Sequence, residues 1–164
     1  MDVQDVAADL VAEQQALDEV VAGLDAADWA ASTPSAGWAV SDQVAHLTYF
    51  ARAAATAITE PEAFRASVEE LWAAARRNGG DDLTLGLFRA LSSDDLLAAW
   101  RDGRMLLAKA AVTLTDEDRV EWYGPSMGAR SFLTARLMEA WRAGQDGVDA
   151  VGGQRPTSDR LRHV

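Results

Sequence analysis

Hydrophobic residues recur every three or four positions along four long stretches of this 164-residue chain. This spacing places them on one face of an α-helix, which can then bury that face against its neighbours. The pattern predicts four long helices, at residues 2–24, 41–58, 92–114 and 129–151. No stretch alternates apolar and polar residues for long enough to build a sheet. We therefore expect an all-α fold, a four-helix bundle.

Shorter features lie between these helices. Pro61 suits the first turn of a further, shorter helix over residues 61–77, which we expect to end at the glycines that follow. Ser41 is the expected N-cap of the second long helix, because its hydroxyl can accept a hydrogen bond from the first turn. The remaining long connections, residues 25–40 and 115–129, are expected to be loops, and the second can contain a brief extended piece at residues 120–123.

The end of the chain predicts a boundary. Residues 1–156 form one domain in this interpretation. Residues 157–164, TSDRLRHV, begin like a capped helix, with Thr157 or Ser158 as the cap, but no helix follows. They are expected to be the start of a missing C-terminal segment. An ordinary C-terminal extension is the alternative that the sequence leaves open.

Charge and composition narrow the classes of partner. The formal net charge is −11 and the pI is about 4.5, so the surface repels phosphate backbones and anionic lipid. Nucleic acid and membrane surfaces are therefore not expected as partners. The chain has no cysteine, which excludes disulfides and cysteine-bound zinc. It shows neither a signal peptide nor an apolar run of about 18 residues, so the expected location is the cytoplasm.

Two residues on the expected inner faces of the bundle are candidate metal ligands. His46 lies in the second long helix and Glu139 in the last, within RLMEAWRAGQD. A carboxylate inside a bundle must be paired or bound to a cation, because burying it alone is costly. A Glu with a His four residues later places two ligands one turn apart, and a facing His completes a three-ligand site. Here the fourth residue after Glu139 is Ala143, so only two of the three ligands are present.

The same residues also have an interpretation without metal. Glu139, Arg142 and Asp146 follow at helical spacing and can form a ladder of opposite charges. Asp146 lies two turns from Glu139, on the order of 10 Å along the axis, which is too far for both to hold one ion. His46 can be a hydrogen-bonded core residue, or it can be protonated and pair directly with Glu139. The sequence leaves these alternatives open.

Two long blocks resemble a known family. GWAVSDQVAHLTYFARAA, residues 37–54, resembles a helix signature of the mycothiol-dependent maleylpyruvate isomerase N-terminal domain family, a branch of the DinB-like metal-binding bundles. WYGPSMGARSFLTARLMEAWRAGQDGVDAVG, residues 122–152, resembles the last-helix signature of one subgroup. The resemblance spans nearly the whole chain. It implies a DinB-like four-helix bundle with an additional short helical segment.

The resemblance also implies chemistry. The family holds a divalent metal, often zinc, with His, Glu and His, and its members act on or with low-molecular-weight thiols such as mycothiol, as isomerases or transferases. Carried over by resemblance, His46 matches the first ligand and Glu139 the second, while the third position falls on Ala143. Losing one of three ligands should weaken zinc binding by orders of magnitude, since even a lost outer-shell partner costs about 10–100-fold.

A second departure from the family is Ala51, where an Asp is usual near the site. An arginine stands beside each departure, Arg52 beside Ala51 and Arg142 beside Ala143. Together with Asp146, these arginines are the expected lining of a pocket at the old metal site.

Three functions compete at this point. The chain is a thiol-dependent isomerase or transferase with an incomplete metal site, a metal-free bundle repurposed to bind or transform a small organic ligand in secondary metabolism, or a non-catalytic interaction domain. The sequence leaves open whether it is an enzyme. The expected partner is a small-molecule substrate or thiol, and a homodimer is also left open.

Overall fold

The computed structural model of the chain describes residues 1–163 and confirms the all-α prediction. Its four long helices are α1 (Val3–Val21), α3 (Val40–Thr59), α6 (Ser93–Ala111) and α7 (Ala129–Ala150). The shorter elements are α2 (Ala26–Trp29), α4 (Pro61–Arg76), α5 (Gly80–Arg89), the strands β1 (Arg119–Val120) and β2 (Met127–Gly128), and the 3-10 helix η1 (Arg160–His163). None of the helices in residues 1–163 is both long enough and apolar enough to cross a lipid bilayer.

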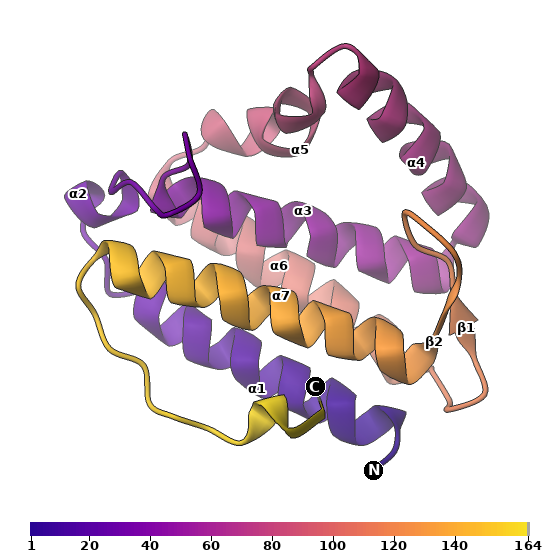
Figure 1. Ribbon diagram of the computed structural model, residues 1–164. Coiled ribbons are helices and arrows are strands. Elements are labelled where there is room, and N and C mark those ends of the chain that lie inside the picture. The colour runs from indigo at the N-terminus through magenta and orange to yellow at the C-terminus, as the bar shows by residue number, and fades with distance from the viewer. Residues whose placement is uncertain (164) are drawn as a thin grey trace.

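The four long helices form a closed ring of contacts. Helices α1 and α3 each pack against both α6 and α7. In Figure 1, α7 lies between α1 and α3, and α6 lies behind them. Helices α4 and α5 arch over α3 and return the chain to the end of the bundle where α3 begins, so α6 runs in the same direction as α3. The bundle therefore brings α3 and α7, far apart in sequence, side by side.

Apolar faces of the long helices meet in the core as the periodicity predicts. Burying such side chains stabilises the fold by about 1.5–3 kcal/mol each. The side chains that are almost fully buried include Val6, Leu10, Val40, Phe64, Leu85, Trp100, Leu107, Phe132, Leu133, Leu137 and Val148. This packing fixes the spacing of α3 and α7, and hence of the polar residues that they carry.

Helix α3 begins earlier than expected. Its N-cap is Ala39, and Ser41 lies inside the first turn, so the predicted Ser41 cap is wrong. The side chain of Asp42 takes over the capping function, because its Oδ2 accepts a hydrogen bond from the Ala39 amide at 3.0 Å. Its Oδ1 accepts a second from Arg89 Nε at 2.9 Å. One carboxylate therefore both starts α3 and ties it to α5.

Helix α5 is absent from the sequence prediction. Gly79 and Gly80 resemble the end of a helix, and they do follow α4. Asn78 reverses the chain with a positive φ of 57°, and a new helix then starts at Gly80. Aspartates in the first turn, Asp81 and Asp82, suit its N-terminus. The predicted loop over residues 115–129 contains a small antiparallel hairpin of β1 and β2.

The C-terminal residues cross the bundle and return to α1. Figure 1 shows the chain leaving α7 and running along the outer side of α1 to η1. There Arg155 contacts Glu13, and Arg160 Nε lies 2.8 Å from Glu13 Oε2. The side chain of Leu161 packs on the core. The predicted boundary at residue 157 stays a prediction, and Val164 lies outside the described residues.

Candidate functional site

His46 on α3 and Glu139 on α7 face each other across the helix pair and adopt the direct pairing that was one of the alternatives left open by the sequence. Their side chains meet directly, with Nε2 of His46 2.7 Å from Oε1 of Glu139. Both are only partly exposed, at 23% and 25% of the side chain. The ring of His46 lies between two aromatic rings, with centroid distances of 5.2 Å to Trp38 and 4.6 Å to Phe50. The imidazole is therefore held in place by packing as well as by the hydrogen bond.

Glu139 has a second partner that sequence reasoning missed. Nη1 of Arg136 lies 2.9 Å from Oε2 of Glu139, so the two carboxylate oxygens are held by different residues. The Arg136 side chain is 12% exposed, and its guanidinium lies 4.2 Å from the ring centroid of Trp122. A cation–π contact of this kind stabilises a guanidinium that has lost part of its hydration on burial. The available signal was the three-residue spacing of Arg136 and Glu139, which places them on one helix face.

These contacts fix the charge state of Glu139. Burial raises the pKa of its carboxyl, but the hydrogen bond from His46 and the charge of Arg136 oppose this and leave the pKa below its ordinary value. Glu139 is therefore ionised at neutral pH. A hydrogen bond to an ionised carboxylate requires a proton on the partner atom, so Nε2 of His46 donates it.

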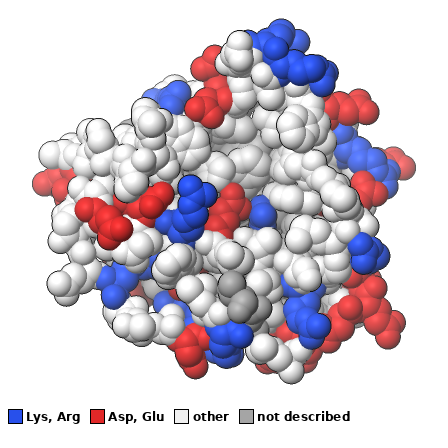
Figure 2. Space-filling model, viewed as in Figure 1, with Lys and Arg blue, Asp and Glu red and all other residues white. Residues whose placement is uncertain are grey.

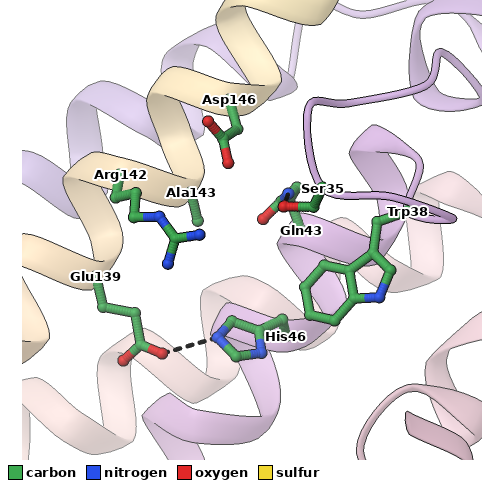
Figure 3. A pocket seen from close by; sticks show the side chains of 8 residues that line it. All are labelled: Ser35, Trp38, Gln43, His46, Glu139, Arg142, Ala143 and Asp146. Atoms are coloured by element: carbon green, nitrogen blue, oxygen red, sulfur yellow. Dashed lines mark hydrogen bonds and ion pairs between the residues drawn. The ribbon is translucent and has the colours of Figure 1, made fainter.

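A pocket of about 280 Å³ opens beside this pair. Its lining comes from the loop before α3, from α3 and from α7, and consists of Ser35, Trp38, Gln43, His46, Glu139, Arg142, Ala143 and Asp146. Figure 3 shows the Arg142 guanidinium and the small Ala143 side chain facing the space that these residues enclose. On the same face of the molecule, Figure 2 shows acidic and basic residues side by side around a hollow near the centre. The expected pocket residues Arg142 and Asp146 thus do line one pocket with His46.

The third expected pocket residue, Arg52, does not line this pocket. Its Nη2 lies 3.5 Å from Asp102 on α6, and its guanidinium lies 5.7 Å from the ring centroid of Phe88. The reason is helical geometry, since residues six apart lie about 120° apart around the axis. Arg52 therefore points away from His46 and bridges α3 to α6.

The proposed ladder of Glu139, Arg142 and Asp146 is also not formed. Within residues 1–163, the ion pair of Glu139 on its own helix is with Arg136, one turn in the other direction. Arg142 acts on Glu139 only through its charge, and this also lowers the pKa of the carboxyl. Arg142 is exposed and leaves its guanidinium available to the pocket.

Comparison with known proteins places this site in a family. The model of the mycothiol maleylpyruvate isomerase N-terminal domain matches residues 10–146, which include every residue of the pocket lining. The chain belongs to this family. Two uncharacterized proteins of Mycobacterium tuberculosis, MT0041 and Rv0036c, are each 42% identical to it over 159 residues, or 96% of this chain. The chain spans only 60% of the length of each of these relatives.

A solved structure supports the same fold. The crystal structure of a histidine-to-alanine mutant of mycothiol-dependent maleylpyruvate isomerase superimposes with a TM-score of 0.69 at 16% sequence identity. The match covers 98% of this chain and 66% of that one. The predicted family and its DinB-like fold are thereby confirmed.

The residues of this family member do not fit the metal site that the family implies. Nε2 of His46, a nitrogen that could bind a metal, instead donates to Glu139, and the other oxygen of Glu139 is held by a guanidinium. The third position, Ala143, has no ligand atom. Within residues 1–163, no three His, Cys, Asp or Glu side chains come close enough to hold a metal ion. The side chains are arranged as an ion-paired cluster beside a pocket.

Proposed function

We propose that this chain binds a low-molecular-weight thiol of the mycothiol class in the pocket beside His46 and Glu139, without a tightly held metal ion. The observation that carries the proposal is the pocket itself, about 280 Å³ in volume, which lies where Ala143 replaces the family's third ligand. Its volume is near the lower end of the range for small-molecule sites. The family match supports the thiol as the ligand class.

The lining offers groups that suit a polar thiol. Arg142 supplies a cation, Asp146 and Gln43 supply acceptors, and the indole of Trp38 supplies a flat apolar wall. A cation beside a bound sulfur favours the thiolate over the thiol, because it stabilises the charged form. In this proposal Arg142 performs that task. His46 and Glu139, already paired with each other and with Arg136, form the rigid polar floor against which the ligand rests.

Calorimetric titration of the chain with mycothiol in the presence of EDTA tests the proposal. The expected result is saturable binding that the chelator does not weaken. Arg142→Gln should reduce the affinity about tenfold, the loss of roughly one charged contact. Arg130→Gln is the matched control, since Arg130 lies on the same helix but outside the pocket and bonds the Met1 carbonyl.

Two outcomes would contradict the proposal. Binding that appears only when zinc is added would show that a metal completes the site. Equal affinities of the wild type and Arg142→Gln would show that the thiol does not bind beside this guanidinium.

A further inference from the structure

Gln43 lies one turn before His46 on α3 and lines the same pocket, yet sequence reasoning gave it no role. The residue is 4% exposed. Its amide nitrogen donates two hydrogen bonds into the loop before α3, to Thr33 Oγ1 at 3.2 Å and to Ser35 Oγ at 3.1 Å. The amide is thus anchored at its nitrogen.

The direction of these hydrogen bonds follows from the chemistry of Thr33. A hydroxyl has a single proton, and Thr33 Oγ1 donates its proton to the Trp38 carbonyl at 3.0 Å. Toward Gln43 the hydroxyl oxygen can therefore only accept. Only the nitrogen end of an amide can donate, so the nitrogen of Gln43 must face Thr33. The amide oxygen is then fixed on the other side.

That oxygen faces the pocket. Figure 3 shows the oxygen of the Gln43 side chain directed into the space shared with Arg142 and His46. Within residues 1–163, no protein group donates a hydrogen bond to it. This oxygen is open to the pocket and not sealed in the core, and an amide oxygen can accept only from an N–H or O–H group. The pocket therefore has an acceptor whose orientation the loop determines in advance.

We propose that Gln43 is a specificity-determining residue whose amide oxygen accepts a hydrogen bond from the pocket ligand. The pocket then selects thiols that carry an N–H or O–H donor for Gln43 in addition to the sulfur that lies beside Arg142. Simple anionic thiols without such a donor bind more weakly. This inference rests on the proposed thiol-binding function and names the class of thiol.

A matched pair of small thiols tests the inference. N-acetylcysteine and 3-mercaptopropionate share a thiol and a carboxylate, but only the first carries an amide N–H. In NMR titrations of the full chain, N-acetylcysteine should bind the wild type about tenfold more tightly, the value of one hydrogen bond to a buried acceptor. Gln43→Met, which keeps the length of the side chain but removes both amide groups, should abolish this preference.

Two further variants separate recognition from loop anchoring. Ser35→Ala removes one bond to the amide nitrogen but leaves the Thr33 contact that fixes the orientation, so it should keep the preference. Thr33→Val removes the fixed acceptor while leaving Gln43 intact, and it should reduce the preference. Thermal denaturation of each variant verifies that it is folded.

The outcomes distinguish this inference from the proposed function. The inference is wrong if Gln43→Met lowers the affinities for both thiols equally or lowers neither. It is also wrong if the wild type shows no preference for N-acetylcysteine. In each case Gln43 does not determine which ligand binds. If the N-acetylcysteine preference depends on Gln43 but mycothiol does not bind, the inference about the donor stands. The assignment of mycothiol as the ligand is then wrong.

Discussion

Glu139 illustrates at the residue scale how a candidate metal ligand is held in an ion-paired cluster. One carboxylate oxygen accepts from His46 and the other meets Arg136, so both oxygens are engaged by protein groups. A divalent ion would have to displace a guanidinium that is almost buried and stacked over Trp122. Zinc binding by the wild type should therefore be weak.

Ala143→His should restore zinc binding in part. Position 143 lies one turn beyond Glu139, and its side chain already faces the pocket. Adding Arg142→Ala removes a nearby cation that repels the metal, and the double variant should bind zinc on the order of 100-fold more tightly than the wild type. Calorimetric titration with zinc measures this.

Met138→His is the control for the zinc experiment. It adds one histidine to the same helix at an exposed position outside the pocket, and it should leave zinc affinity unchanged. Tight zinc binding by the wild type would contradict the predicted weak binding and show that another group replaces the missing histidine. No gain in the double variant would show that the pocket does not keep the ligand geometry of the family.

Arg136→Gln should destabilise the protein by about 1–3 kcal/mol at neutral pH, because it leaves Glu139 with one partner instead of two. The folded-state pKa of Glu139 is depressed, so the ion pair contributes stability above the unfolded value near 4.5 and loses it as pH falls through the folded value. Urea denaturation at neutral pH and in acid measures the free energy of unfolding.

Arg130→Gln, an exposed arginine on the same helix, should change the free energy of unfolding by no more than about 0.5 kcal/mol. A loss for Arg136→Gln that persists unchanged in strong acid would contradict the ionic explanation.

The sequence predicted the two residues that meet but not the way they are held. Periodicity and the family motif together indicate which positions on two helices face each other. The sequence could therefore predict that His46 and Glu139 lie opposite one another. The arginine that pairs with Glu139 could not be predicted, because one arginine lies three residues before it and another three residues after it. Packing against Trp122 selects Arg136, and the sequence pattern does not show this contact. Arg52 was predicted to line the pocket because it follows Ala51 in the sequence. Its angle around the helix, which directs it away from His46, was not considered.

At the element scale, the long helices were predictable and the connections were not. Apolar spacing located all four helices of the bundle, although α1 ends at Val21 instead of residue 24. The start of α3 depends on Asp42, which bonds the Ala39 amide and Arg89 together. The bond to Arg89 is long-range and cannot be predicted from a local pattern, whereas the bond to the Ala39 amide three residues away is a local signal that the choice of Ser41 overlooked. Helix α5 was missed because two glycines outweighed the aspartates that follow them.

The C-terminal residues are joined to α1 by a buried carboxylate. Glu13 is 1% exposed and pairs with both Arg155 and Arg160. Glu13→Gln should destabilise the chain by roughly 3 kcal/mol, because it leaves two arginines without their buried counter-charge. Urea denaturation measures the loss. Glu19→Gln makes the same chemical change at an exposed position of α1 and should have little effect.

A loss of less than about 0.5 kcal/mol for Glu13→Gln would mean that the crossing segment is not held to the bundle by these ion pairs. Limited proteolysis gives an independent readout. Cleavage between α7 and η1 should be faster in Glu13→Gln than in the wild type if the segment is released from α1.

At the scale of the whole molecule, the ring of helices gives the pocket its position. The pocket uses the loop before α3, the first turns of α3 and the second half of α7, which the fold brings together from residues about a hundred positions apart. The rest of the surface is strongly acidic, with a formal net charge of −11. The guanidinium of Arg142 in the pocket lining therefore provides a local attraction for a thiolate that the remaining surface does not.

Native mass spectrometry of the chain with mycothiol tests the central claim most directly, because it weighs ligand and metal in one complex. The chain is purified without chelator and without an affinity metal, and zinc is supplied at the same concentration as the thiol. We predict a complex whose mass equals the chain plus one mycothiol, with no zinc. A complex that contains one zinc ion with the thiol, and that loses both in His46→Ala, would contradict the account.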